Sequence, residues 1–345
     1  MGGAEVFTHE VLKRWAAAGH KVTLFTARFR GSKQDEVDDG VNIVRSGGTY
    51  SVYWKAREHY RRHFSKEEYD AVIDEINTVP FLASKFVGRG EKVIALIHQL
   101  AREYWFYETP FPASYFGYYV LEKRWLKNYR NIPTVTVSES SRKDLAELGF
   151  AKVFVVGEGL NFQPLEKSEK KKGSPVIVFV GRLKRAKRPD NAVEAFRMIK
   201  QKVPNTELWI IGDGYLKEKL VRNAPEGVRF FDPPSNKERR ELIKKSWVLV
   251  NPSAREGFGL NVIEANALGV PSVAYDVAGL RDAIVDGKTG LLSIPESTED
   301  LANAIIRILT DADLRNRLSE EALVRARNFN WDKVADEFMR IIRTA

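Results

Sequence analysis

The chain has 345 residues, of which 43% are hydrophobic and 29% charged, and its formal net charge is +9. This length allows two domains, and the apolar fraction is that of a globular protein with a substantial core. Cysteine is absent, which excludes disulfides, thiolate metal sites and a cysteine nucleophile. The sequence has no apolar run of about 18 residues, so we expect neither a transmembrane helix nor an N-terminal signal peptide.

The basic residues are spread along the chain and form no dominant block. Nucleic acid is therefore not the expected partner. A moderately basic surface suits phosphorylated substrates or anionic lipid head groups instead.

The chain opens on a glycine pair, Gly2-Gly3, that leads directly into an amphipathic helix ending at Gly19. A strand over 21–26 follows. In an α/β fold, a Gly-Gly turn before a helix normally follows a strand, and none precedes it here. We therefore expect that about a dozen residues holding the first strand are missing from this sequence. The alternative is that the helix begins the protein.

The rest of the first half alternates between strand and helix patterns. The expected strands cover 41–45, 70–73, 92–97 and 133–138, and the expected helices cover 53–64, 79–87 and 139–149. His98 comes directly after the strand over 92–97, and open α/β sheets bind ligands at the carboxyl ends of their strands. His98 is therefore an active-site candidate, with a purely structural histidine as the alternative.

Residues 102–129 are unusually rich in Tyr, Phe and Trp, and Lys123, Arg124 and Lys127 lie among them. We expect most of these rings to form core and helix-packing surface. The alternative is an acceptor cleft, or an amphipathic helix that contacts a membrane with aromatic rings beside basic residues at head-group depth.

A charged, polar run within residues 161–174 predicts the linker between two domains, covering 1–160 and 175–330. A second alternation follows this linker. Its expected strands cover 176–180, 208–211, 228–231, 248–250 and 272–275, and its expected helices begin at Pro189 and cover 299–309, 313–327 and 331–342. Strands that alternate with helices indicate parallel sheets, so the predicted class is α/β with two doubly wound, Rossmann-like domains.

The most informative stretch of the chain covers residues 251–269. A buried strand ends at Asn251-Pro252, a turn with Gly257 and Gly259 follows, and a helix opens near Leu260. A helix N-terminus reached through glycines offers unpaired N–H donors, which suit a phosphate. Glu256 and Glu264 flank this turn, and carboxylates beside a phosphate suit sugar hydroxyls, so the pattern indicates a nucleotide sugar. The alternative is that Glu264 only favours the helix dipole and Glu256 is a solvated loop charge.

A basic loop over 181–189 follows the strand over 176–180. Its Arg182 and Lys187 could hold a phosphate, because arginine grips phosphate with two donors and lysine acts as a point charge. The alternative is an ordinary basic surface loop. Gly212-Asp213-Gly214, after the next strand, is consistent with a ligand-binding loop or with a simple turn.

Taken together, these stretches resemble glycosyltransferase family 4, a family of retaining enzymes with the GT-B fold, along nearly the whole chain. The matching motifs are Gly2-Gly3-Ala4-Glu5, His98, Ser138-Glu139-Ser140, Gly181-Arg182-Leu183 with Lys187, Gly212-Asp213-Gly214, Glu256-Gly257-Phe258-Gly259-Leu260 with Glu264, Gly269-Val270-Pro271 and Asp286-Gly287 with Gly290. The two glutamates eight residues apart, with Phe-Gly-Leu between them, are the most specific of these motifs.

The resemblance implies a donor site in a cleft between the two domains, with the acceptor mainly on the first. It implies that the helix over 331–345 packs back on the first domain. The implied diphosphate ligands are Arg182, Lys187, Gly3 and the backbone N–H groups of Gly259, Leu260 and Asn261. Glu264 would bind the ribose, Glu256 and His98 would act at the transferred sugar, and Gly212, Gly214 and Phe230 would border the base.

The resemblance also implies retention of anomeric configuration and catalysis without a metal or cofactor, because cationic side chains stabilise the leaving diphosphate. Two departures from the family pattern concern donor contacts. The usual Pro-Asn-Gly-Val-Asp before the hinge reads Gly157-Glu158-Gly159-Leu160-Asn161, and Phe231-Asp232-Pro233-Pro234 replaces the usual Leu-Gly turn beside the base pocket.

The predicted function is transfer of a hexose from a nucleotide-diphosphate sugar to a glycan or lipid-linked acceptor of the cell envelope. The expected location is the cytoplasm, with peripheral contact to the anionic inner face of the membrane. One alternative is a nucleotide-sugar epimerase or hydrolase of the same fold, and a second is a non-catalytic nucleotide-sugar sensor. A phosphorylase that uses pyridoxal phosphate is less consistent with the sequence.

Overall fold

The computed structural model describes residues 2–88 and 90–345, which form two compact units. Unit 1 contains residues 1–102, 115–159 and 330–345, and unit 2 contains residues 103–114 and 160–329. The short segment 103–114 therefore packs with unit 2, although the expected boundaries assign it to the first domain. The structure has an α/β fold with parallel sheets in each unit, which confirms the predicted class.

Unit 2 is built on one six-stranded sheet in the order β10-β9-β8-β11-β12-β13, and all its paired strands run parallel. The strands are β8 (Val176–Val180), β9 (Glu207–Ile211), β10 (Val228–Phe231), β11 (Val248–Asn251), β12 (Ser272–Tyr275) and β13 (Gly290–Ser293). All five residues of β8 are buried, as their uninterrupted apolar sequence predicts for a central parallel strand.

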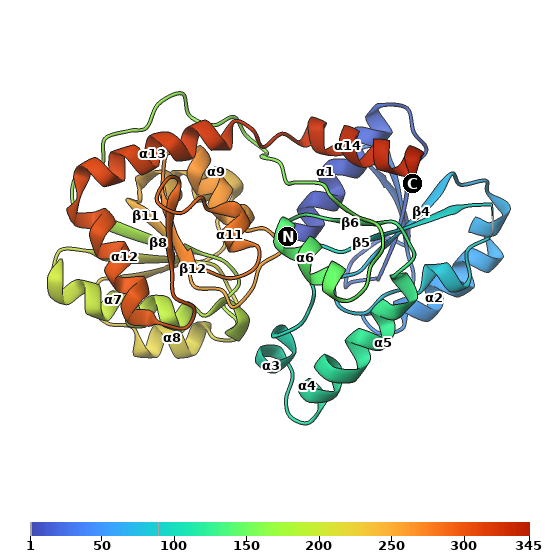
Figure 1. The fold of residues 1–345 in the computed structure, drawn as a ribbon, viewed down its shortest axis with the longest axis horizontal. Coiled ribbons are helices and arrows are strands. Elements are labelled where there is room, and N and C mark those ends of the chain that lie inside the picture. The colour runs from blue at the N-terminus through green and yellow to red at the C-terminus, as the bar shows by residue number, and fades with distance from the viewer. Residues whose placement is uncertain (1, 89) are drawn as a thin grey trace. The chain divides into compact units, whose positions relative to one another are not determined.

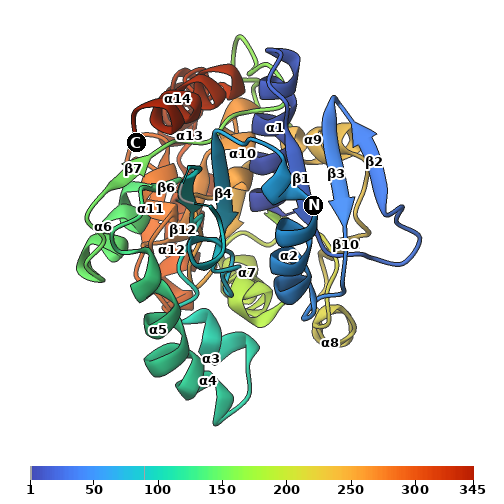
Figure 2. The same cartoon turned by 90° about the vertical axis from the view of Figure 1, so that its right-hand side faces the viewer.

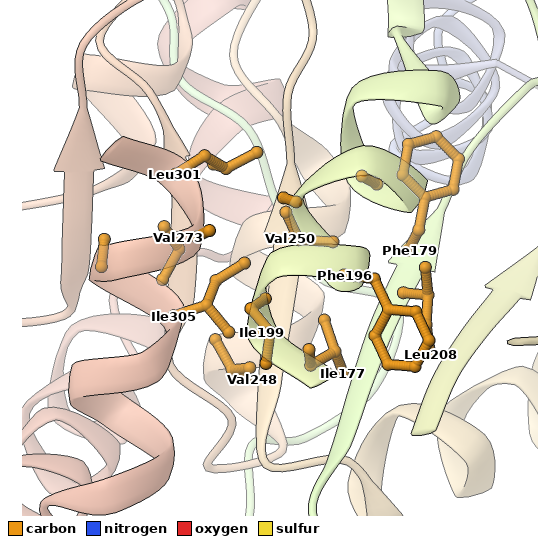
Figure 3. Close-up of a cluster of buried hydrophobic side chains, with 14 of the residues drawn as sticks. Ile177, Phe179, Phe196, Ile199, Leu208, Val248, Val250, Val273, Leu301 and Ile305 are labelled. Carbon is orange, nitrogen blue, oxygen red and sulfur yellow. The ribbon is translucent and has the colours of Figure 1, made fainter. Parts of the chain in front are cut away.

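Helices cover this sheet on both sides. They are α7 (Pro189–Lys202), α8 (Lys217–Asn223), α9 (Asn236–Lys245), α10 (Leu260–Ala267), α11 (Leu280–Ala283), α12 (Thr298–Thr310) and α13 (Ala312–Ala326). Figure 3 shows the core on one face, where Phe196 and Ile199 of α7 and Ile305 of α12 meet Ile177 and Val248 of the sheet. The expected helices in this half begin and end within a few residues of the observed ones.

The topology of unit 2 also positions a site. From the central strand β8, the chain moves outward through β9 and β10 and then returns to β11 on the other side of β8. The strand order therefore reverses between β8 and β11. Doubly wound sheets bind ligands at the carboxyl ends of the strands beside such a reversal, because the loops there diverge.

Unit 1 contains two separate sheets, part of which is visible in Figure 2. The first has the order β1-β3-β2, from β1 (Thr23–Thr26), β2 (Asp35–Asp38) and β3 (Val41–Arg45), and β2 runs antiparallel to β3. The second is wholly parallel, with the order β4-β5-β6-β7, from β4 (Ala71–Glu75), β5 (Lys92–Leu96), β6 (Thr134–Thr136) and β7 (Val153–Val155).

Strands β1 and β4 are therefore sheet edges, each hydrogen-bonded to one neighbour. Leu24 and Phe25 on β1, and Val72 and Ile73 on β4, are only partly buried although their sequence is that of interior strands. Such edges can accept a further strand. The absence of a first strand stays a prediction.

Helices α1 (Gly3–Ala17), α2 (Val52–Arg62), α6 (Glu139–Glu147) and α14 (Trp331–Thr344) complete unit 1 (Figure 1). Helix α14 packs on α1, where the Trp15 indole N–H donates to the carbonyl of Ala335 at 3.0 Å. Ser138 caps α6 by accepting from the N–H of Ser141, as its position predicts.

The helix predicted over 79–87 is wrong. The segment contains only the short 3₁₀ turn η2 (Ala83–Lys85), preceded by Leu82 with a φ of +57°. The buried carboxylate of Asp74 accepts hydrogen bonds from the N–H groups of Phe81 and Ala83 and holds the chain in this irregular path. A tertiary contact from β4 thus overrides the local helical pattern.

Residues 113–129 form an almost continuous helical run made of α4 (Ala113–Phe116), the π-helical η3 (Gly117–Leu121), α5 (Glu122–Leu126) and the 3₁₀ turn η4 (Lys127–Tyr129). Leu126 and Tyr129 are buried, whereas Tyr115, Phe116 and Tyr119 are each more than half exposed. The aromatic stretch therefore contributes both to the core and to the surface. Among residues 2–88 and 90–345, no helix is both long and apolar enough to cross a bilayer.

Candidate functional site

The loops after β8 and β11 meet in unit 2 through an ion pair between Lys187 and Glu256. Lys187 lies in the 3₁₀ turn η5 (Arg185–Lys187), and its ammonium is 2.5 Å from Oε1 of Glu256. The same carboxylate oxygen accepts from the hydroxyl of Ser253 at 2.8 Å. The side chains of Lys187 and Glu256 are only 16% and 14% exposed, so the pair is largely shielded from water.

Burial opposes the charge on Lys187 and would lower its pKa, but Glu256 and the phenol of Tyr104 outweigh it, so the pKa of Lys187 is raised. A buried, permanently charged lysine at a strand reversal suits an anionic ligand. Arg182 lies on the same loop and is exposed, and within the described residues it has no ion pair. Of these two predicted phosphate ligands, Lys187 is therefore a fixed cation and Arg182 is open to solvent.

The N-terminus of α10 completes this edge of the sheet. Gly259 precedes the helix with a φ of +105°, which favours glycine, and its missing side chain allows the close approach of Leu280. The amide of Asn261 donates to the carbonyl of Val180 at 2.9 Å and accepts from Asn251 at 3.1 Å. The first turn of α10, with its unpaired N–H groups, is thereby fixed to the ends of β8 and β11.

Glu264, one turn further along α10, pairs with Arg239 of α9 at 2.8 Å. Burial raises the pKa of Glu264, and the charges of Arg239 and Arg240 offset part of that rise. A carboxylate has about four acceptor positions, so the contact with Arg239 leaves room for hydroxyl groups.

Gly212 and Gly214 have a structural reason to be glycine. A Cβ on Gly212 would lie 2.0 Å from the carbonyl oxygen of Gly181, and one on Gly214 would lie 2.4 Å from that of Leu183. The N–H of Leu183 also donates to the carbonyl of Asp213. The 212–214 turn therefore supports the backbone of the basic loop, whether or not it also borders a base. Phe230 is partly buried against the core.

His98 and Gly3 lie in unit 1. His98 is 5% exposed, and its Nε2 is 3.3 Å from Oε1 of Glu75 at the end of β4. The other oxygen of Glu75 accepts from the hydroxyl of Thr8 at 2.8 Å. Neither ring nitrogen of His98 has a well-oriented hydrogen-bond partner in the part of the chain that the structure describes. This cluster therefore places a carboxylate and an imidazole together at the carboxyl ends of β4 and β5, while Gly3 begins α1.

Several residues at these sites were not predicted from the sequence. They are Glu75, Arg239, Gly279, Arg255 and the pair Glu103 and Tyr104. Glu75 could have been found by the rule that selected His98, since Glu75 ends the parallel strand β4 and His98 lies just beyond the end of β5. Gly279 has a φ of +82°, and a Cβ there would lie 2.2 Å from the carbonyl oxygen of Glu256. No local signal indicates the long-range partners Arg239 and Tyr104.

Comparison with known protein families gives two matches that meet near residue 162. The model described as Glycosyltransferase Family 4 matches residues 1–163, and the model described as Glycosyl transferases group 1 matches residues 162–325. Together they cover nearly the whole chain.

Among curated proteins, the chain is similar to a D-inositol 3-phosphate glycosyltransferase of Corynebacterium urealyticum. The two are 31% identical over 181 residues, which is 49% of this chain and 43% of that protein. The chain spans about half the length of the curated relatives it matches.

Solved structures that resemble the whole chain in fold include the following two. Sucrose-phosphate synthase from Thermosynechococcus elongatus aligns with a TM-score of 0.83 at 22% identity, covering 99% of this chain and 93% of that one. Anabaena HepE, solved in complex with UDP-glucose, aligns with a TM-score of 0.74 at 15% identity, covering 100% and 97%.

Proposed function

Because this chain belongs to glycosyltransferase family 4 and has the GT-B fold, we propose that it is a retaining hexosyltransferase. It transfers a sugar from a nucleotide-diphosphate sugar to an acceptor hydroxyl, without a metal ion. The observation that carries this proposal is the buried ion pair between Lys187 and Glu256 at the strand reversal of unit 2. The pair supports the proposal because a fixed lysine suits a phosphate and the adjacent carboxylate suits sugar hydroxyls.

The donor diphosphate binds to Lys187, Arg182 and the N–H groups of Gly259, Leu260 and Asn261. When the bond between the sugar and the diphosphate breaks, negative charge grows on the leaving group. Donors that already point to this position stabilise that charge without having to reorganise. Lys187 then shares its charge between the phosphate and Glu256.

Glu264 accepts hydrogen bonds from the ribose, Glu256 contacts the transferred sugar, and Gly212, Gly214 and Phe230 border the base. In unit 1, the cluster of His98 and Glu75 acts on the sugar side, and Gly3 at the start of α1 is a further ligand of the diphosphate. Retention follows if the acceptor attacks on the face that the diphosphate leaves, with a phosphate oxygen taking the acceptor proton.

A donor screen tests the proposal. UDP-, GDP- and ADP-glucose are added to the full chain, and the melting temperature is measured. One nucleotide class is expected to stabilise the protein by about 2.7 kcal/mol at 100 times its dissociation constant. If none of the three changes the melting temperature, the transferase proposal is wrong. Release of free sugar without any acceptor would indicate a hydrolase, and binding without any turnover would indicate a sensor.

For the acceptor, we propose a glycan or lipid-linked molecule at the anionic, cytoplasmic face of a membrane. The support is a surface of residues 115–127, where Tyr115, Phe116 and Tyr119 are 52%, 53% and 55% exposed and the basic Lys123 and Lys127 are also exposed. Aromatic rings next to lysines suit the level of lipid head groups.

Vesicle sedimentation tests this surface. The wild-type chain is expected to sediment with anionic vesicles and not with neutral ones, because both charge and ring insertion contribute. Replacing Tyr115, Phe116 and Tyr119 by serine should reduce the bound fraction several-fold. Trp54→Ser, at a 79% exposed ring elsewhere in unit 1, is the matched control and should leave binding unchanged. Equal binding to neutral vesicles, or an equal loss in the control, would contradict the proposal.

A further inference from the structure

Helix α3 (Tyr104–Glu108) comes from the first half of the chain but packs within unit 2. The chain leaves unit 1 at Arg102, which has a φ of +40°. The buried carboxylate of Glu122 holds this exit by accepting from the N–H groups of Ala101 and Arg102. These hydrogen bonds fix the backbone at residues 101 and 102, directly before the segment that packs in unit 2.

Tyr104 contacts both loops of the donor site. Its hydroxyl donates to the carbonyl of Arg255, the residue before Glu256, at 3.2 Å. The Tyr104 phenol also interacts with the Lys187 side chain and contributes to its raised pKa. The ammonium of Lys184 lies 4.9 Å from the centre of the Tyr104 ring. One side chain therefore joins the loop after β8 to the loop after β11.

The neighbouring side chains of this segment strengthen the same connection. Glu103 accepts from the guanidinium of Arg255 at 2.9 Å. At the other end of α3, Glu108 accepts from the N–H of Ala186, beside Lys187, and from the hydroxyl of Tyr215, each at 2.9 Å. The segment thus holds the backbone on both sides of the pair formed by Lys187 and Glu256.

We propose that Tyr104 is a positioning residue of the donor site, which holds Lys187 and the Glu256 loop in the arrangement that binds the donor diphosphate. This inference rests on the proposed function. A lysine carries its charge on a flexible four-carbon stem, so a buried ammonium needs fixed partners to stay in one place. Glu256 accepts one of its three N–H donors, and the Tyr104 phenol interacts with the same side chain, so Lys187 has partners from both loops and can still donate to a phosphate oxygen.

Without the phenol oxygen, the Lys187 ammonium loses one fixed partner and the carbonyl of Arg255 loses its donor. The ammonium then turns further toward Glu256, and the diphosphate must compete with that carboxylate. Tyr107, on the same helix, provides a matched comparison. Its hydroxyl contacts Arg188 and Glu296 and lies outside the contact between Lys187 and Glu256.

The test compares Tyr104→Phe and Tyr107→Phe in the full chain. Titration calorimetry measures the affinity for UDP, GDP or ADP, using the nucleotide that stabilises the wild type most. Tyr104→Phe is expected to weaken this affinity about tenfold, as loss of a hydrogen bond to a charged group does. It should also lower kcat and raise the KM for the donor, with the acceptor KM unchanged. Tyr107→Phe should stay within about twofold of the wild type.

The outcomes separate the two proposals. If wild-type protein binds none of the three nucleotides, the proposed function fails, and this inference fails with it. If wild-type protein binds and Tyr104→Phe binds equally well, only the positioning role is wrong. If both phenylalanine variants lose affinity and melting temperature together, α3 only stabilises the fold, which also overturns the role of Tyr104.

Discussion

Replacement of Glu256 by alanine is expected to lower kcat by about 10²-fold or more, and also to destabilise the protein. From its place on a loop, the sequence predicts a large loss of turnover with little loss of stability. The structure changes the second part of that expectation, because Glu256 is the carboxylate partner of the largely buried Lys187. Removing one member of such a pair leaves a buried charge without its counter-ion, which costs about 3 kcal/mol or more.

The double variant Glu256→Ala, Lys187→Met separates the two effects. It removes the stranded charge, so much of the lost melting temperature should return, whereas kcat should stay low. Glu139→Ala, which removes an exposed carboxylate paired with Arg142, is the control and should change neither quantity appreciably. If Glu256→Ala melts like the wild type, the pair does not stabilise the fold. If it also keeps normal kcat, Glu256 has no role in the reaction.

The fold of unit 2 was the part most readily predicted from the sequence. Its strands are mostly apolar, with β8 an uninterrupted apolar run, and residues such as Pro189 and Gly259 mark the helix starts. The motifs that contain Arg182, Lys187, Glu256 and Glu264 were part of the resemblance to glycosyltransferase family 4, which the two family matches confirm. Local pattern succeeds here because the site residues lie close in sequence to the carboxyl end of a strand or to the start of a helix, in the loops after β8 and β11 and on α10.

Unit 1 was less predictable because long-range contacts decide its irregular parts. The polar strand β2 (Asp35–Asp38) has no apolar alternation, and it forms only because β3 offers an antiparallel edge. The false helix over 79–87 is displaced by Asp74, whose side chain no local pattern connects to Phe81. The partners of predicted site residues, such as Arg239 beside Glu264, were likewise inaccessible, because they lie on separate elements.

The assignment of α3 to unit 2 likewise depends on long-range contacts that the local sequence does not predict. The aromatic composition of residues 102–129 suggested one packing surface. In the structure, Tyr104 contacts the donor loops of unit 2, whereas Tyr129 is buried in unit 1 against Asp74. Composition alone contains no signal for such a division, because both parts of the stretch are rich in aromatic residues.

Glu158→Gln is expected to stabilise the protein at neutral pH. Glu158 replaces the asparagine of the usual family turn, is 5% exposed, and its Oε2 has no hydrogen-bond partner among residues 2–88 and 90–345. The backbone beside it cannot easily move, since a Cβ on Gly159 would lie 2.4 Å from the Trp331 ring. Burial raises the pKa of Glu158 well above its ordinary value, because the charged form lacks compensation there.

The sign of the pH dependence follows from that shift. The unfolded chain releases the Glu158 proton near pH 4.5, whereas the folded chain retains it to a higher pH. Each pKa unit by which the folded-state value of Glu158 exceeds the unfolded-state value lowers the free energy of unfolding by about 1.4 kcal/mol, once the pH is above both pKa values. The loss therefore grows as pH rises from the unfolded pKa to the folded one. Glutamine cannot ionise, so Glu158→Gln should match the wild type at pH 4.5 and melt several degrees higher at pH 8.

Calorimetric melting at pH 4.5, 6 and 8 measures this difference, with Glu147→Gln at an exposed position of α6 as the control. The control should show no gain that depends on pH. A melting difference for Glu158→Gln that is the same at all three pH values would mean that the carboxyl does not change its ionisation on folding. A lower melting temperature at pH 8 would mean that the Glu158 charge is compensated within the fold, so that this family-atypical glutamate stabilises its turn.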